Sequence, residues 1–129
     1  VNEDKTWIHI WLPFCPADNC TNIAYYEQLF EQVKDDGVQL IFISATYDVA
    51  KISTIANQSN FSLPIYVLDG EYYGVKLKKV REKFYRDLIP NAPDSTSYFV
   101  DNYIFEGTEP VYQGTEINDS IIRYANVVK

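Results

Sequence analysis

The spacing of apolar residues along the chain predicts strands that alternate with helices. Short apolar runs are typical of buried strands, and they predict strands at residues 7–12, 38–45, 63–68, 96–100 and 108–113. Apolar residues three and four apart are typical of amphipathic helices, and they predict helices at about residues 21–35, 49–56, 76–88 and 115–128. The predicted order is therefore β-α-β-α-β-α-β-β-α.

Residues that favour the ends of helices and the edges of sheets support these boundaries. Gly37 is expected to end the first helix, because glycine readily adopts the left-handed conformation that follows many helices. Asp48 and Thr115 are expected to cap the helices that follow them. Pro110 lacks an amide N–H, so its strand is expected at an edge of the sheet. The last helix should bury a set of apolar residues, namely Ile117, Ile121, Ile122, Tyr124 and Val128.

The order of elements predicts the fold class. Strands that alternate with helices indicate parallel βαβ units, with helices on both faces of one sheet. The last two strands follow each other directly, so they add an antiparallel hairpin. We therefore expect an α/β fold, a three-layer α/β/α sandwich with a mixed central sheet. A chain of 129 residues suits one domain, and we expect residues 1–129 to form it.

Composition and charge limit the classes of partner that are expected for this chain. The chain has 11 basic and 18 acidic residues, and its net charge of −7 argues against nucleic acid as a partner. No apolar run approaches the about 20 residues that a membrane helix requires, so no membrane span is expected. The chain begins at Val1 and contains no methionine, so we expect it to be excised from, or processed out of, a longer chain.

The two cysteines of the chain carry the clearest functional signal. Cys15 and Cys20 lie between the first predicted strand and the first predicted helix. A thiol at a helix N-terminus is favoured as thiolate, the form that attacks disulfides and peroxides. A core of this size does not need a disulfide for stability, so redox-active thiols are the leading interpretation. The alternative is a structural disulfide or a pair of unreactive thiols.

The order of elements, with a cysteine pair after the first strand, resembles the thioredoxin fold, and within it the branch of TlpA-type thiol oxidoreductases and peroxiredoxins. Four motifs carry the resemblance across nearly the whole chain, at residues 10–15 (IWLPFC), 41–48 (IFISATYD), 97–101 (SYFVD) and Gly114. The resemblance implies a thiol–disulfide oxidoreductase that uses no cofactor and no metal. It implies that Cys15 attacks the substrate disulfide and that Cys20 resolves the mixed disulfide.

The resemblance also implies the surroundings of the site. The residues expected to contact the substrate are Trp11, Pro13, Phe14 and Pro16, together with Ser95 and Thr96 across a cleft. The expected partners are proteins with a dithiol or disulfide and a protein that supplies reducing equivalents. The expected location is periplasmic or otherwise extracytoplasmic in a bacterium, with room for a membrane anchor upstream of Val1.

The chain departs from the TlpA pattern in two respects. Four residues separate Cys15 from Cys20, where TlpA-type enzymes have two. On a regular helix that spacing puts the Cα atoms about 8–9 Å apart, beyond the about 7 Å that a disulfide spans. The cysteines can therefore pair only if residues 16–19 form a turn or the first helical turn unwinds. In addition, Ser95 stands where the family has a substrate-docking cis-proline.

Other classes with this fold remain alternatives. Some peroxiredoxins share the four-residue spacing, but they need a threonine and an arginine where this chain has Leu12 and, near the proline position, Ser95. Copper chaperones of the Sco type need a histidine late in the chain, whereas the single histidine here is His9. A binding module without redox chemistry is supported by the missing proline. Two cysteines and His9 fall short of the four ligands of a structural zinc site, and we expect His9 to be structural.

Basic residues cluster on one predicted helix. Six of the 11 basic residues lie at positions 76, 78, 79, 81, 83 and 86. The leading interpretation is a solvated helix face. A docking surface for an acidic partner is the alternative.

Overall fold

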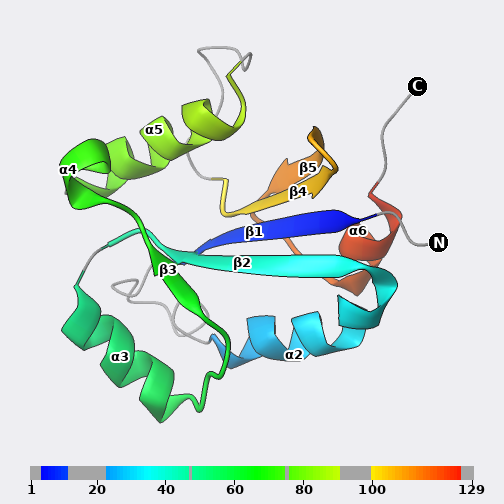
Figure 1. Ribbon diagram of the computed structural model, residues 1–129, viewed down its shortest axis with the longest axis horizontal. Helices are drawn as coiled ribbons and strands as arrows, with labels where there is room; N and C mark the ends of the chain where they lie inside the picture. The colour runs from blue at the N-terminus through cyan, green and yellow to red at the C-terminus, as the bar shows by residue number, and fades with distance from the viewer. Residues whose placement is uncertain (1–3, 12–22, 47, 75, 91–99, 126–129) are drawn as a thin grey trace.

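The computed structural model describes residues 4–11, 23–46, 48–74, 76–90 and 100–125 (Figure 1). The strands are β1 (Lys5–Trp11), β2 (Val38–Ser44), β3 (Ile65–Val67), β4 (Asn102–Glu106) and β5 (Glu109–Gly114). The helices are α2 (Ala24–Val33), α3 (Val49–Gln58), α4 (Gly70–Tyr73), α5 (Leu77–Leu88) and α6 (Asp119–Tyr124), with a 3₁₀ turn at Lys34–Asp36. Most predicted elements are found within a few residues of the predicted positions.

One mixed sheet organises the molecule. Its strand order is β3-β2-β1-β4-β5. The pairs β1–β2 and β2–β3 are parallel, whereas β1–β4 and β4–β5 are antiparallel. Two parallel crossovers followed by a C-terminal hairpin are the thioredoxin-like arrangement, so the predicted α/β class and mixed sheet are confirmed.

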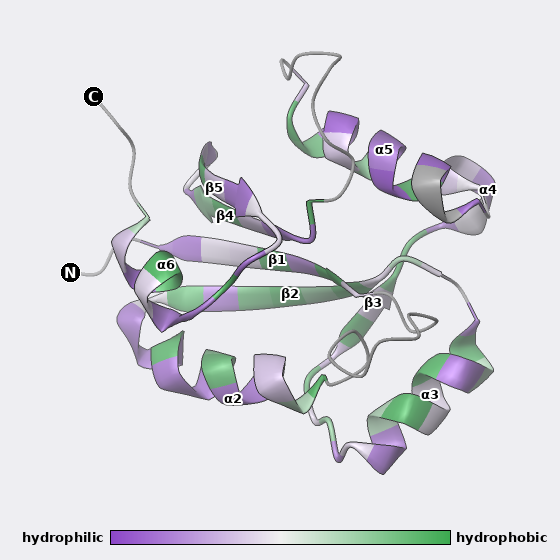
Figure 2. Ribbon diagram, turned by 180° about the vertical axis from the view of Figure 1, so that it is seen from behind, coloured by the Kyte–Doolittle hydropathy of each residue, from purple (hydrophilic) through white to green (hydrophobic). Residues whose placement is uncertain are grey.

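Helices cover both faces of this sheet (Figures 1 and 2). Side chains alternate along central strand β1, so its successive residues belong to the cores on opposite faces of the sheet. Ile8 and Ile10 point to the face covered by α5, where Phe84 and Tyr85 meet them. On the other face, Trp7 packs against residues of α2 and α6, and Trp11 packs against residues that include one from α3. The result is the three-layer sandwich that the sequence predicts.

Three residues have the roles that the sequence predicts for them at helix ends and in an edge strand. Gly37 follows the 3₁₀ turn after α2 in the left-handed conformation, with φ 81°. The Asp48 carboxylate accepts a hydrogen bond from the Lys51 N–H at 3.1 Å and so caps α3. Pro110 lies in β5, an edge strand, where its missing N–H costs the sheet nothing.

The strand that pairs with β1 and β5 lies later in the chain than the strand predicted at residues 96–100. β4 is Asn102–Glu106; Val100 precedes it, and residues 96–99 lie outside the described residues. The physical reason is that Asn102, a residue type disfavoured in strands, is fully buried here with its side chain hydrogen-bonded. The tertiary contacts of Asn102 offset its low strand propensity.

The last helix also begins later than predicted. Asn118, not Thr115, caps α6, and its side-chain oxygen accepts the Ile121 N–H at 2.9 Å. Ile117 and Ile122 are buried as expected, but Tyr124 is 79% exposed because it lies in the last turn of a short helix, facing away from the core. Val128 lies outside the described residues. The short helix α4 was not predicted.

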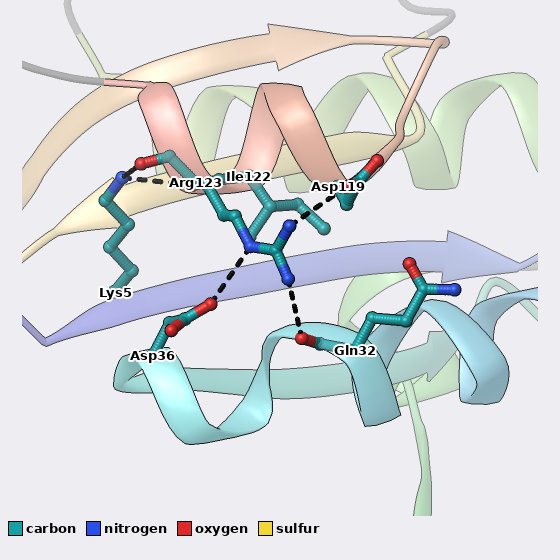
Figure 3. A network of polar contacts seen from close by, with 6 residues as sticks. All are labelled: Lys5, Gln32, Asp36, Asp119, Ile122 and Arg123. Carbon is teal, nitrogen blue, oxygen red and sulfur yellow. Dashed lines mark hydrogen bonds and ion pairs between the residues drawn. The ribbon is translucent and has the colours of Figure 1, made fainter.

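Two basic side chains hold α6 to the rest of the fold (Figure 3). The Arg123 guanidinium donates to the carboxylates of Asp36 and Asp119, each at 3.0 Å, and to the Gln32 carbonyl at 2.9 Å. The Lys5 ammonium donates to carbonyls at the C-terminal end of α6, those of Ile122, Arg123 and Ala125, at 3.0, 2.9 and 2.7 Å. A cation at the negative end of the helix dipole stabilises a helix that is short on its own.

Candidate functional site

The carboxyl ends of the parallel strands meet at one edge of the sheet, the carboxyl edge, where the sequence predicts the site. β1, β2 and β3 run in the same direction, so Trp11, Ser44 and Val67 lie at one edge. β4 begins at the same edge, since Asn102 lies opposite His9 and the Asp101 carbonyl accepts the Ile10 N–H at 2.8 Å. This carboxyl edge is where open α/β sheets bind ligands. It is also the edge at which the described part of β1 ends, four residues before Cys15.

Of the predicted site residues, Trp11 is the one that the structure describes. The others lie outside the described residues, namely Pro13, Phe14, Cys15, Pro16, Cys20, Ser95 and Thr96. The described chain resumes at Ile23, just before α2, and at Val100, just before β4. Disulfide reach between the cysteines and the position of Ser95 and Thr96 therefore stay predictions.

Trp11 ends β1 inside the core. It is 1% exposed, and it packs with Ile23, Phe42 and Ile52 between the sheet and its helices. Its indole Nε1 is buried and has no hydrogen-bond partner among the described residues. An unpaired buried donor costs on the order of 1–3 kcal/mol, and such groups deserve a functional explanation. Within the described part of the chain, the Trp11 N–H thus has no acceptor, and it lies at the end of the strand that leads into the cysteine segment.

His9, on the same face as Trp11, is buried and neutral. Its Nδ1 lies 2.8 Å from the Asn102 side-chain oxygen, and its ring stacks on Tyr26 with centroids 3.9 Å apart. Because this oxygen accepts, Nδ1 carries the proton. Burial lowers the pKa of His9 to about 4, with the charge of Arg81 acting in the same direction. The imidazole is therefore uncharged near neutral pH, which agrees with the structural role expected for it.

Asn102 organises the polar centre of this face and was missed by sequence reasoning. Its side-chain oxygen also accepts the Trp7 indole N–H at 3.0 Å, and its amide nitrogen donates to the Thr115 carbonyl at 3.2 Å. One side chain therefore joins β1, β4 and the segment before α6. The available signal was the apolar run Tyr103–Phe105, which Asn102 precedes directly after the motif at residues 97–101.

An ion pair lies on the opposite face near the same edge. The Arg81 guanidinium of α5 donates to the carboxylate of Asp101, with the two side chains 10% and 27% exposed. Burial raises the pKa of Asp101, and the charge of Arg81 opposes that rise. Tyr85, one helical turn beyond Arg81, has a buried hydroxyl without a hydrogen-bond partner among the described residues.

The basic helix is more than a solvated face. The Lys83 ammonium donates to the Tyr72 carbonyl at 2.7 Å and lies 3.7 Å from the centre of the exposed Tyr72 ring. Arg86 lies 3.8 Å from the Glu82 carboxylate. The prediction of a solvated face is thus wrong for Arg81, whose side chain is 10% exposed and paired with Asp101, whereas the contacts of Lys83 are made at the surface.

The groove beside this helix has charges of both signs in its lining. It has a volume of about 370 Å³ and is lined from α4 and α5 by Glu71, Tyr72, Tyr73, Gly74, Lys79, Glu82, Lys83 and Arg86. Three basic and two acidic side chains balance each other closely. Within the described ranges, no group of three or more His, Cys, Asp or Glu residues could hold a metal ion.

Comparisons with known proteins leave the family open. No family model matches the chain, and no curated protein matches it. Among solved structures, the crystal structure of yeast Sco1 is similar over 92% of this chain and 78% of the Sco1 chain, with a TM-score of 0.47 and 18% identity. No helix in the described part of the chain is long and apolar enough to cross a membrane.

Proposed function

We propose that the protein is a thiol–disulfide oxidoreductase of the TlpA-like type. The Cys15 thiolate attacks one sulfur of a substrate disulfide, a mixed disulfide forms, and the other substrate sulfur leaves as a thiolate. The Cys20 thiolate then attacks the Cys15 sulfur. This step releases the second substrate thiol, so the substrate is reduced and Cys15–Cys20 is oxidised to a disulfide. A partner dithiol protein returns the pair to the reduced state.

One observation carries this proposal: in the sequence, both cysteines lie between the end of β1 and the start of α2. Trp11 is the last residue of central strand β1, and Ile23 precedes α2. Each cysteine lies within four residues of one of them in the sequence. The proposal requires the attacking thiol to lie at a helix N-terminus, where the helix dipole and oriented N–H groups favour thiolate. The Trp11 N–H, which has no acceptor among the described residues, is available as a donor to a group near the end of β1.

The partners and location follow from the same proposal. Substrates are proteins that carry accessible disulfides, and we propose that Pro13, Phe14, Pro16, Ser95 and Thr96 contact them. The chain then acts in an extracytoplasmic compartment, where disulfides form and persist.

Trapping variants test the chemistry. Cys20→Ser should accumulate a mixed disulfide at Cys15, because the resolving thiol is gone, and should appear as a dithiothreitol-sensitive band of higher mass on non-reducing gels. Cys15→Ser is the matched control and should trap nothing. The wild type should reduce insulin disulfides. If neither variant traps a partner and insulin stays oxidised, the oxidoreductase proposal fails and a redox-inactive binding module replaces it.

The reduction potential separates a working pair from a structural bond. A Cys15–Cys20 potential of roughly −120 to −270 mV is expected for turnover, whereas a value below about −300 mV indicates a structural disulfide. Peroxide consumption by the same preparation should be negligible, since Leu12 occupies the position where peroxidases of this fold need a hydroxyl group.

A further inference from the structure

A run of aromatic side chains leads from the two buried tryptophans to the protein surface. Trp7 is fully buried, and the centroid of its ring lies 6.4 Å from that of Tyr26 in α2. The ring of Tyr26 in turn lies 5.3 Å from the ring of Tyr25, which is 43% exposed. Trp11 joins the same run through Phe42, whose ring lies 5.7 Å from Trp11 and 5.8 Å from Tyr26. These separations are those of aromatic rings in contact.

The surroundings of the two indoles favour the passing on of an oxidation. Tryptophan and tyrosine are the aromatic side chains that most readily lose one electron, and an indole that does so becomes a cation, which is costly among apolar rings. The Trp11 N–H has no acceptor among the described residues, and the Trp7 N–H donates to the side-chain oxygen of Asn102, a neutral amide and a poor base. Neither indole therefore has a described base that would take its proton. An oxidised indole is left to recover an electron from a phenol nearby.

The exposed end of the run is the place where such an oxidation comes to rest. A phenol holds the oxidation when it releases its proton. Burial raises the pKa of Tyr26, with the charge of Asp101 acting in the same direction, so Tyr26 releases its proton reluctantly. The Tyr25 hydroxyl donates to the Ile117 carbonyl at 2.8 Å, and its side chain lines a surface hollow of about 190 Å³ between α2 and the start of α6. Solvent is thus at hand to accept the proton of Tyr25.

Other exposed tyrosines lack this connection to the tryptophans. Tyr66 and Tyr124 are 57% and 79% exposed, more than Tyr25, and within the described ranges neither of their rings contacts another aromatic ring. A second group of ring contacts, around α5, contains no tryptophan and consists of Tyr72, Tyr73, Phe84, Tyr85 and Tyr103. Contact with Tyr26, and not exposure alone, therefore distinguishes Tyr25.

We propose that Tyr26 and Tyr25 form a relay that carries one-electron oxidation of the buried tryptophans to the surface, with Tyr25 as the site of repair or modification. An oxygen-centred radical takes one electron from an indole and is reduced. The indole recovers an electron from Tyr26, and Tyr26 from Tyr25, whose hydroxyl releases its proton to solvent and leaves a neutral tyrosyl radical. A small reductant such as ascorbate returns one hydrogen atom; without it, two such radicals pair to form the carbon–carbon bond of a dityrosine. The relay uses no cysteine and does not depend on the proposed disulfide exchange.

The test uses the full chain with Cys15 and Cys20 replaced by serine, so that no thiol competes for the radical. A laser pulse that tryptophan absorbs and tyrosine does not ejects an electron from the indoles, and a cobalt(III) ammine complex removes that electron. Transient absorption should show the tryptophanyl signal decaying as a tyrosyl signal grows, at a rate independent of protein concentration. Tyr25→Phe keeps the ring and removes the hydroxyl, and should lose most of the long-lived tyrosyl signal. Tyr124→Phe is the matched control, because it removes a more exposed phenol, and should behave like the parent.

Mapping of the products locates the end of the relay. After illumination of the parent without a reductant, peptide mass spectrometry should find dityrosine cross-links at Tyr25 in preference to Tyr66 and Tyr124, and added ascorbate should suppress them. Tyr26→Phe, checked for folding by circular dichroism, should slow the decay of the tryptophanyl signal severalfold. Equal tyrosyl yields from Tyr25→Phe and Tyr124→Phe overturn the proposal, whether or not Tyr26→Phe folds. So do cross-links spread evenly over the exposed tyrosines.

Discussion

At the scale of single residues, the His9–Asn102 pair shows how burial changes chemistry. An imidazole at the surface titrates near pH 6.5, but His9 is stacked on Tyr26 and buried, and its pKa falls to about 4. The neutral ring can donate from Nδ1 to Asn102, while its protonated form would leave a charge in an aromatic layer. The fold therefore selects the neutral form of its single histidine.

This shift predicts a dependence of stability on pH. The folded-state pKa lies below the unfolded value, so the stabilisation is complete above pH 6.5 and is lost as the pH falls from 6.5 towards 4. The expected loss from this group is about 3 kcal/mol. Urea denaturation of the wild type and of His9→Phe at pH 7.5 and 4.5 measures it. The difference between the two proteins should shrink or reverse at the lower pH, and a constant difference would contradict the assigned cause.

At the scale of elements, the short helix α6 depends on partners outside itself. Six residues are too few for a helix to be stable alone. The Lys5 ammonium bonds three carbonyls at its C-terminal end, and Arg123 ties it to the turn after α2. Strand β1 and helix α6 are thus coupled although they lie at opposite ends of the chain.

Replacing Lys5 should loosen α6 selectively. Lys5→Met keeps the side-chain length and removes three charge-assisted bonds, so we expect a loss of about 1–2 kcal/mol in the free energy of unfolding. Amide exchange at Ile121 and Ile122 should speed up more than exchange in β2. Lys34→Met is the control, because Lys34 forms an exposed pair with Glu31, and the loss of such a surface pair should leave the free energy of unfolding nearly unchanged. Equal effects of the two substitutions would show that the carbonyl contacts contribute nothing.

At the scale of the whole molecule, β1 joins the two cores. It pairs with β2 on one side and β4 on the other, and it contributes side chains to both faces. Both tryptophans of the chain, Trp7 and Trp11, lie in this strand and are almost fully buried. Their fluorescence therefore reports on the centre of the fold.

This arrangement predicts a single cooperative unfolding transition. Tryptophan fluorescence and far-ultraviolet circular dichroism should give the same midpoint in urea, because neither core can persist once β1 leaves the sheet. Ile104→Ala, which empties a fully buried position in β4, should shift both curves together by about 2–5 kcal/mol. Separate midpoints for the two signals would show that the faces unfold independently.

The sequence by itself determined the elements whose residues all agree with one structure. The run 38–45 is apolar enough to be a strand buried on both faces, and Gly37 and Asp48 provide the expected helix-end conformation and cap on either side of it. The alternation of strands and helices then specified the parallel crossovers and the mixed sheet. The cysteine pair and its place after the first strand are likewise sequence properties.

The tertiary structure decided the positions where a polar residue finds its partner far along the chain. Asn102 is a strand residue because Trp7, His9 and Thr115 satisfy its amide, and the Arg81 side chain is largely covered because it pairs with Asp101. Local propensity reflects the cost of ordering or burying such groups, but not the compensation from residues 13 to 95 positions away.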